Sequence, residues 1–284
     1  MQKISYDDLI TSIASLVNQR IHDLLPQNNN RLTQAMHYSA LSPGKRLRPF
    51  ILFTTSQIWK VDQEHALRVA AVLEIIHSYS LIHDDLPAMD NDDYRRGMPS
   101  CHKKFDEAAA ILAGDALLTL AFEILADEKT HPDSNIRCEL IKILSSRIGT
   151  EGIAGGQMLD LIYEKEHITN YDQLVNAQYM KTAKLFMACC EMGAALGYAS
   201  AEEKLHLSNY AKNFGLAFQF IDDLADINDN KPLNNNNIVK LIGKEHTLEK
   251  SKEFIEKAHN EISFFKEKGE LLSQLAYSLL DPPK

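Results

Sequence analysis

Helical periodicity runs along nearly the whole 284-residue chain and constrains its fold more than any other feature. Apolar residues recur at steps of three and four over residues 63–84, and stretches rich in Ala and Leu cover 108–125, 185–196 and 205–225. Strand signals are weak, because no Asn-Gly or Asp-Gly hairpin occurs and alternation of β-branched residues is rare. We therefore predict an all-α fold of about ten helices of ordinary length.

The breaks between these segments are short and polar. They are the loop 26–30, the turn 42–44 before a helix at Lys45, the loop 90–100, residues 131–133 before a helix near Ser134, and the Asn-rich stretch 229–237, which we expect to be mobile. None is long enough to link domains, and no repeat has a fixed period. The length alone would also suit two small domains. The economical prediction is one all-helical domain over residues 1–284.

Composition excludes several classes of function. The formal charge of −9 argues against nucleic acid as a partner, so an anionic substrate would need a local basic patch or a metal. Cys101, Cys138, Cys189 and Cys190 form no C-x-x-C motif and are expected to be reduced thiols of a cytoplasmic protein. No signal peptide is evident, and purely apolar runs fall short of the roughly 18 residues that indicate a membrane span, so we expect no membrane anchor.

Two aspartate clusters end apolar, helix-like runs. The first comprises Asp84, Asp85 and Asp90, and the second comprises Asp222, Asp223 and Asp226. Carboxylates at the end of a buried helix repel one another and are poorly hydrated, which raises their pKa values or destabilises the fold. Hard divalent cations relieve both problems and in turn hold diphosphates. If the clusters face each other across a cavity, they form a site that binds or breaks a diphosphate ester. The alternative is a pair of solvated helix ends.

The clusters differ in their local geometry. Asp222 and Asp226 are four residues apart, so they share one face of a helix, with Asp223 beside them. Asp90 lies six residues after Asp84, which is not one helical face. Pro87 interrupts that helix, and Asp90 reaches the same cation only if the chain turns after Asp85.

Basic residues lie close to the first cluster in sequence. Lys45 and Arg48 are three residues apart and are expected on one helical face, with Gly44 before them where backbone N–H groups favour an anion. Arg95 and Arg96 follow the first cluster, and guanidinium groups match phosphate oxygens two at a time. Either pair would otherwise be ordinary solvated surface.

Further polar residues interrupt the apolar helices. His77 lies two helical turns before Asp84 and could donate to a phosphate, although a core histidine is the plain alternative. Lys181 and Thr182 begin an apolar run and offer a cation and a hydroxyl. Residues 155–157, followed by Asp160, indicate a close helix approach with polar groups nearby. Surface or packing roles would account for each of these signals by itself.

Together these motifs resemble the trans-polyprenyl diphosphate synthases. The resemblance rests on G-K-R-L-R-P at 44–49, His77, D-D-x-x-x-x-D at 84–90, R-R-G at 95–97, G-G-Q-x-x-D at 155–160, K-T at 181–182 and F-Q-x-x-D-D-x-x-D at 218–226. Residues 79–90 are most similar to the bacterial farnesyl diphosphate synthases. The motifs occur in the family's order and together are highly specific.

The resemblance implies antiparallel helices around a deep central cavity, three Mg²⁺ ions per site and a homodimer. It implies condensation of isopentenyl diphosphate with dimethylallyl and then geranyl diphosphate. It assigns Asp84, Asp90 and Asp222 to the metals, with support from Asp85, Asp223 and Asp226. It assigns the allylic diphosphate to Arg95, Lys181, Thr182, Phe218 and Gln219, and isopentenyl diphosphate to Gly44, Lys45, Arg48, His77 and Arg96. Asp84, Asp90, Asp222, Arg95 and Lys181 are then the catalytic residues.

Mg²⁺, Arg and Lys would stabilise the leaving diphosphate in an apolar, closed cavity, and the departing diphosphate would take the proton, so no protein base is nominated. Tyr79, with Ser80, lies about one turn below the first cluster and is expected to set product length; a plain core tyrosine is the alternative. Residues 229–237 lack the family's G-K-x-T lysine, and Lys231 and Lys240 are the two candidate substitutes.

Alternative products are geranyl or geranylgeranyl diphosphate. Alternative classes are an all-α nucleotide pyrophosphatase, which should carry Glu-rich motifs, and an inactive subunit of a heteromeric synthase, which would usually have lost acids from a cluster. The sequence does not determine the product's chain length.

Overall fold

The all-α prediction is confirmed. The computed structural model describes residues 6–166, 170–229 and 234–281, and in these ranges the chain forms fourteen α-helices and one hairpin of two-residue strands. The number exceeds the ten predicted because short helices such as α5 (Cys101–Lys104) and α12 (Ile238–Ile242) carry no periodic pattern long enough to find. The chain divides into two compact units, 1–53 with 61–141, and 54–60 with 142–284.

The first unit contains α1 (Tyr6–Leu24), α2 (Arg31–Ala40), most of α3 (Leu47–Gln57), α4 (Gln63–Asp84), α5, α6 (Glu107–Ala126) and the start of α7 (Ser134–Ile148). The hairpin pairs β1 (Tyr94–Arg95) with β2 (Met98–Pro99). The second unit contains α8 (Ile153–Glu166), α9 (Tyr171–Gln178), the π-helical turn η1 (Tyr179–Ala183), α10 (Lys184–Leu196), α11 (Ala201–Ala225), the 3₁₀ turn η2 (Asp226–Asp229), α12, α13 (Lys244–Ile262), η3 (Ser263–Gly269) and α14 (Glu270–Ser278).

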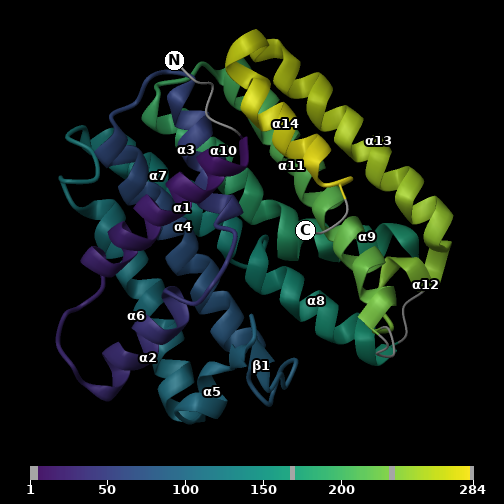
Figure 1. Ribbon diagram of the computed structural model, residues 1–284, viewed down its shortest axis with the longest axis horizontal. Helices are drawn as coiled ribbons and strands as arrows, with labels where there is room; N and C mark the ends of the chain where they lie inside the picture. The colour runs from purple at the N-terminus through teal and green to yellow at the C-terminus, as the bar shows by residue number, and fades with distance from the viewer. Residues whose placement is uncertain (1–5, 167–169, 230–233, 282–284) are drawn as a thin grey trace. The chain divides into compact units, whose positions relative to one another are not determined.

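Helix α4 is the core of the first unit. It begins where the side chain of Asp62 accepts hydrogen bonds from the backbone N–H groups of Glu64 and His65, and most of its residues are buried. A helix that is apolar nearly all round has no face to present to water, so it packs against α6, α1 and α2 (Figure 1). Asp84 is therefore the last residue of a buried and rigid helix.

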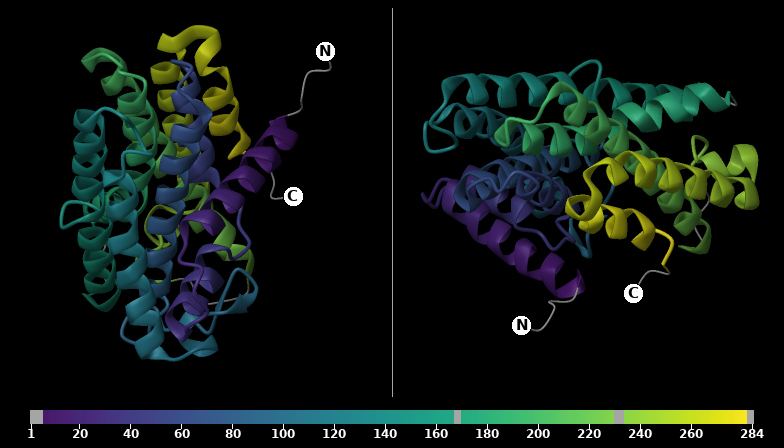
Figure 2. Two further views of the ribbon diagram at one scale, coloured as in Figure 1. Left: turned by 90° about the vertical axis from the view of Figure 1, so that its left-hand side faces the viewer. Right: turned by 90° about the horizontal axis from the view of Figure 1, so that it is seen from above.

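Helix α11 has the same role in the second unit. A capping box between Ser200 and Glu203 starts it, and it packs against α10 and α13. Phe186 and Phe214 meet edge to face with ring centroids 5.0 Å apart, and the buried Tyr210 hydroxyl donates to the Leu272 carbonyl at 2.7 Å. Figure 2 shows α13 and α14 side by side in yellow. The second aspartate cluster therefore also ends a buried helix.

Two local predictions were wrong. The helix expected at Lys45 begins at Leu47, because Arg46 takes a left-handed conformation with φ 51°. The loop 90–100 contains the β1–β2 hairpin, whose two turn residues, Arg96 and Gly97, both have positive φ, as a type I′ turn requires. Arginine is uncommon in such a turn, so the sequence carried no hairpin signal.

Helix α6 departs from the expectation of no membrane-length segment. Among the described residues, α6 is the one helix whose length and composition would allow it to span a membrane. Its mean hydropathy is 1.9. Asp115 interrupts its apolar run, which hid it from a search for uninterrupted runs. Ile111 is 44% exposed and Leu112 is 56% exposed, so this helix shows an apolar face.

Candidate functional site

The first aspartate cluster ends α4 in a tight turn. Asp84 is the last residue of the helix and Asp85 is its C-cap. The backbone N–H of Asp90 donates to the Asp84 carbonyl at 2.9 Å, and the N–H of Met89 donates to the Leu86 carbonyl at 2.9 Å. The predicted turn after Asp85 is therefore present, and it brings the backbone of Asp90 back to Asp84.

Arg95 is tied to this cluster by two acids. Its Nε donates to Asp85 Oδ1 at 2.9 Å and its Nη2 donates to Asp92 Oδ2 at 2.7 Å. The Asp85 side chain is 3% exposed, and burial raises its pKa although the bond to Arg95 opposes that shift. The β1 strand thus holds a guanidinium group against the end of α4.

A buried ion pair lies next to these residues. Arg46 Nη1 donates to Glu74 Oε1 at 2.7 Å, and the two side chains are only 1% and 2% exposed. Arg96 Nη2 lies 3.6 Å from the same oxygen. On the same helix, one turn further on, His77 Nε2 accepts from Arg48 Nη1 at 3.2 Å.

The charges around His77 are mostly positive. Burial, followed by the guanidinium groups of Arg48, Arg96, Arg46 and Arg95, holds the pKa of His77 well below its usual value. A neutral ring accepts from Arg48 at Nε2 and carries its N–H at Nδ1. The group is therefore suited to a multiply charged anion.

Lys45 and Arg48 do not share a helical face, which corrects the prediction. Lys45 precedes the helix and is exposed, while Arg48 lies in the first turn of α3. The left-handed Arg46 between them breaks the helical register. Gly44 also makes room for the guanidinium of Arg96, because a Cβ there would lie 2.9 Å from Arg96 Nη1.

Tyr79 and Ser80 lie on α4 below the first cluster. Tyr79 is 9% exposed, and its ring meets His83 edge to face with centroids 5.8 Å apart. Burial, with a smaller effect of Asp84, raises the pKa of Tyr79 to about 12. Ser80 Oγ donates to the His77 carbonyl at 2.9 Å.

A small cavity of about 30 Å³ lies beside the first cluster. Asp85, Arg95, Tyr38 and Cys101 are among the residues that line it. This volume admits water but not a substrate chain.

The second cluster is organised around Asp223, which is buried while Asp222 and Asp226 are exposed. The N–H of Asp226 donates to the Asp222 carbonyl, which confirms the predicted helical spacing. Burial raises the pKa of Asp223 to about 6; hydrogen bonds from Ile238 and Gln219 oppose the shift, and the charges of Asp222 and Asp226 add to it. The direction of this shift is the one expected for a buried carboxylate next to other acids.

Lys181 and Thr182 lie in the π-helical turn η1, not at the start of a helix as predicted. A Cβ on Gly156 of α8 would lie 2.2 Å from the Lys181 N atom, and one on Gly215 of α11 would lie 2.5 Å from the Ala183 Cα atom. The backbone of the turn therefore packs closely against Gly156 on α8 and against Gly215 on α11. π-turns inside helices often mark functional sites, and this one carries both Lys181 and Thr182.

A chain of hydrogen bonds connects this turn to the second cluster. Thr182 Oγ1 donates to Gln219 Oε1 at 2.8 Å, and Gln219 Nε2 donates to Asp223 Oδ1 at 2.9 Å. Gln178 Nε2 donates to Asp223 Oδ2 at 2.9 Å. Phe218 packs on Phe186 with ring centroids 5.4 Å apart.

The described part of the Asn-rich segment is bound to the same residues. Asn236 Nδ2 donates to Asp160 Oδ1, while Lys181 Nζ bonds the other oxygen of Asp160 at 2.5 Å. Asn237 Nδ2 donates to the Asp223 carbonyl at 3.2 Å. These bonds involve the described residues 235–237 of the segment, and Lys231 lies outside the described residues. Lys240 Nζ donates to Asn235 Oδ1 at 3.3 Å.

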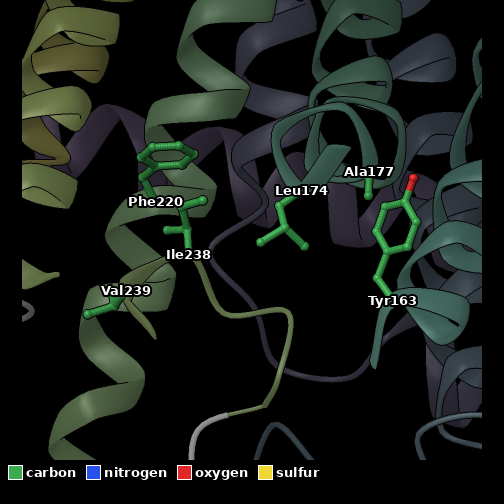
Figure 3. Packing of buried hydrophobic residues seen from close by; sticks show 6 residues of the cluster. All are labelled: Tyr163, Leu174, Ala177, Phe220, Ile238 and Val239. Atoms are coloured by element: carbon green, nitrogen blue, oxygen red, sulfur yellow. The ribbon is translucent and has the colours of Figure 1, made fainter. Parts of the chain in front are cut away.

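An apolar cluster holds this segment in place. Ile238 and Phe220 are fully buried in it and Val239 is 9% exposed, together with Leu174 and Tyr163 (Figure 3). The N–H of Ile238 donates to Asp223 Oδ2 at 2.9 Å. Burial of Ile238 thus brings a backbone donor to the second cluster.

The donor chemistry fits a hard divalent cation. Carboxylate oxygens are the ligands that Mg²⁺ prefers, and the raised pKa values of Asp85 and Asp223 indicate negative charge that burial disfavours. In the part of the chain that the structure describes, no three His, Cys, Asp or Glu side chains already converge in a metal-binding arrangement.

Sequence reasoning missed several residues of this region. Arg46 and Glu74 form the buried pair, Asp92 holds Arg95, and Asn236 holds Asp160. A glutamate within the otherwise apolar α4 was the available signal for Glu74, since glutamate is rarely buried without a partner. No pattern predicted that Arg46 would point inward.

Comparison with known proteins agrees with the fold and these groups. Residues 29–240 match the polyprenyl synthetase family. The chain is 46% identical over 205 residues to the farnesyl diphosphate synthase of Escherichia coli, covering 72% of this chain and 68% of that protein. A solved FPP/GFPP synthase from Zymomonas mobilis is 38% identical, with a TM-score of 0.92 over 97% of this chain and 99% of that one. A geranyltransferase from Legionella pneumophila is 35% identical, with a TM-score of 0.89 over 96% of each chain.

The fold and the family match identify a prenyltransferase enzyme. The chain belongs to the polyprenyl synthetase family.

Proposed function

We propose that this prenyltransferase joins isopentenyl diphosphate to dimethylallyl diphosphate and then to geranyl diphosphate, which yields farnesyl diphosphate. The observation that carries the proposal is the group of arginines around His77, which lies on the helix that ends in the first aspartate cluster. A group of positive charges beside carboxylates suits a diphosphate accompanied by cations. The similarity to the farnesyl diphosphate synthase of Escherichia coli supports the choice of product.

We propose that Asp84, Asp90 and Asp222 hold Mg²⁺, with Asp85, Asp223 and Asp226 in support. The number of ions, about three per site, is an expectation from the family. Bound Mg²⁺ would supply Lewis-acid stabilisation of the diphosphate as it leaves.

The chain's own residues then have separate tasks. The allylic diphosphate is held, while its C–O bond breaks, by Lys181, Thr182, Gln219 and Arg95. Phe218 lies on the same turn of α11 as Gln219. The group at Gly44, Lys45, Arg48, His77 and Arg96 holds isopentenyl diphosphate so that its double bond attacks the allylic carbon. The proton lost afterwards passes to the departing diphosphate. Cationic donors stabilise the charge that develops on that group, which is electrostatic catalysis.

The Asn-rich segment is the point of departure from the family. Asn236 binds Asp160, the residue that also holds Lys181, and Asn237 binds the Asp223 carbonyl. We propose that amide groups organise this region where relatives use a lysine.

We also propose that residues 1–284 act as one catalytic domain in a cytoplasmic homodimer. The exposed apolar residues Ile111 and Leu112 of α6 are our candidates for the contact between subunits, because association buries exposed apolar side chains. The net charge of −9 is consistent with the absence of a nucleic-acid partner.

The test is a direct assay. The purified protein is incubated with Mg²⁺, isopentenyl diphosphate and dimethylallyl diphosphate, and the products are weighed by mass spectrometry. A fifteen-carbon diphosphate is expected. A ten- or twenty-carbon product would correct the product to geranyl or geranylgeranyl diphosphate. Hydrolysis of nucleotides without condensation would replace the proposal by the pyrophosphatase class, and no product of either kind would favour an inactive subunit.

A further inference from the structure

Glu74 is a buried carboxylate to which the reaction assigns no task. It lies in the middle of α4, 2% exposed, and its Oε1 accepts from Arg46 Nη1 at 2.7 Å while Arg96 Nη2 lies 3.6 Å away. Arg46 uses its remaining donors on Asn18 Oδ1 at 2.8 Å and on the carbonyl of Ser42 at 2.7 Å. One glutamate therefore contacts arginines from two separate loops, the segment before α3 and the hairpin turn.

Both arginines have left-handed backbones. Arg46 has φ 51° and Arg96 has φ 54°, a conformation that costs a non-glycine residue roughly 1 kcal/mol or more. Such conformations persist only where the surroundings hold them. Glu74 is the charged group that the two share, and both also donate to Ser42.

The position of these arginines controls their neighbours. Arg46 lies between Lys45 and Arg48, so its backbone sets the direction in which both cations leave the chain. Arg96 Nη1 donates to Ser42 Oγ at 3.2 Å and lies against Gly44. Arg48 reaches His77, one turn beyond Glu74 on α4. The three proposed cations for isopentenyl diphosphate (Lys45, Arg48 and Arg96) and the neutral His77 are thus close to the Glu74 pair in the chain or in space.

We propose that Glu74 is a positioning residue that, through Arg46 and Arg96, sets the geometry of the isopentenyl diphosphate subsite. This inference rests on the proposed function. Glu74 does not touch the substrate; it holds two strained loops so that Lys45, Arg48 and Arg96 converge on one diphosphate.

A positioning role and a purely electrostatic role of Glu74 predict opposite changes in diphosphate affinity when Glu74 is neutralised. Glu74 carries negative charge into a group of cations, so its neutralisation would strengthen the attraction for a diphosphate if charge alone mattered. If Glu74 positions the loops, its neutralisation weakens binding although the subsite becomes more positive. A structural role elsewhere in the fold would change stability and leave diphosphate binding as it was.

The experiment compares Glu74→Gln and Glu74→Asp with the wild-type protein. Glu74→Gln removes the charge at constant size, and Glu74→Asp keeps the charge but shortens its reach by one methylene. Each variant is titrated calorimetrically with inorganic diphosphate, and KM is measured separately for isopentenyl and allylic diphosphate. We expect about tenfold weaker diphosphate binding in both variants and a similar rise in KM for isopentenyl diphosphate, with KM for the allylic substrate changed less than about twofold.

Asp127→Asn is the matched control. It breaks the ion pair between Asp127 and Arg68, in which the N–O distance is 2.8 Å. Arg68 lies on α4, as Glu74 does, but away from the arginine group. It should lower stability but leave KM for both substrates unchanged. Arg46→Met with Glu74→Met replaces the buried pair by apolar side chains, which usually preserves folding, and it should weaken diphosphate binding as Glu74→Gln does.

Tighter or unchanged diphosphate binding in folded Glu74→Gln, with Glu74→Asp unchanged, would overturn the inference. A wild-type protein that binds diphosphate but makes no prenyl product would instead overturn the proposed function. The calorimetric comparison still decides the role of Glu74 in that case, because it needs no turnover.

Discussion

His77 and Arg48 share a hydrogen bond of 3.2 Å that requires a neutral imidazole ring. Burial, followed by the nearby guanidinium groups, lowers the pKa of His77 in the folded protein. The same principle governs Asp223, where burial and the charges of its neighbours raise the pKa to about 6. At the scale of single residues, a bound anion would balance the arginines around His77, and a bound cation would balance the carboxylates around Asp223.

We expect His77 to make the protein less stable as the pH falls below about 6.5. The pKa of His77 is lowered in the folded state, so in this range the unfolded chain binds a proton that the folded chain does not, and stability decreases with falling pH. Each pH unit below 6.5 should cost up to about 1.4 kcal/mol until the folded pKa is reached. Urea unfolding of wild type and His77→Gln at pH 7.5 and 5.5 measures this. Equal pH dependence in the two proteins would contradict it.

Tyr79→Ala should lengthen the product. The ring is 9% exposed and lies about one turn below Asp84, where a bulky side chain would stop a growing prenyl chain. Chromatography of the products with mass detection should show chains longer than those of the wild type. Tyr79→Phe, which keeps the ring, should retain the wild-type profile. An unchanged profile in a folded Tyr79→Ala protein would make Tyr79 a plain core residue.

Elements position the site through their ends and their irregularities. Helices α4 and α11 are regular and buried, and each delivers aspartates at its last turn. The π-turn η1 and the hairpin turn at Arg96 are irregular, and both carry cations. Regular elements could be predicted from periodicity, whereas the irregular turns depend on contacts with distant segments such as Gly156 and Gly215.

Gly215→Ala should displace the π-turn. The new Cβ would lie 2.5 Å from the Ala183 Cα atom, so the turn that carries Lys181 and Thr182 must move. We expect a loss of about 1–3 kcal/mol in the free energy of unfolding, and at least about a tenfold lower kcat/KM for the allylic substrate. Gly149→Ala is the control, since a Cβ there meets only Ser145 O, at 3.1 Å. Normal kinetics in folded Gly215→Ala would show that the turn tolerates the shift.

At the scale of the whole molecule, the chain carries two kinds of surface that a ligand or partner should cover. One is the set of carboxylates that ends α4 and α11. The other is the exposed apolar face of α6. Each leads to a measurement on the intact protein.

Mg²⁺ and inorganic diphosphate together should stabilise the protein. A ligand at a hundred times its dissociation constant adds about 2.7 kcal/mol, which raises the melting temperature of a chain of this size by several degrees. Differential scanning fluorimetry with both ligands, with each alone and after EDTA measures the effect. EDTA should abolish both the added stability and the prenyl transfer; no shift with the combined ligands would argue against the metal proposal.

Leu112→Glu should convert a dimer to monomers. The substitution places a charge on the apolar face of α6, where Leu112 is 56% exposed. Light scattering after size-exclusion chromatography gives the mass directly. Leu205→Glu, at a leucine that is 61% exposed on α11, is the control and should leave the mass unchanged. A wild-type protein that is already monomeric would refute the homodimer.

The sequence by itself determined the all-α class, the bounds of long helices such as 63–84, and the spacing of both aspartate clusters, because periodicity and helix geometry are local properties. Only the tertiary structure decided that Glu74 and Arg46 form a buried pair, that Arg96 sits in a type I′ turn, and that Lys181 lies in a π-turn between two glycines. Burial and close packing join residues that are far apart in the chain, and a local pattern carries no record of which distant group will hold a charge or fill a space.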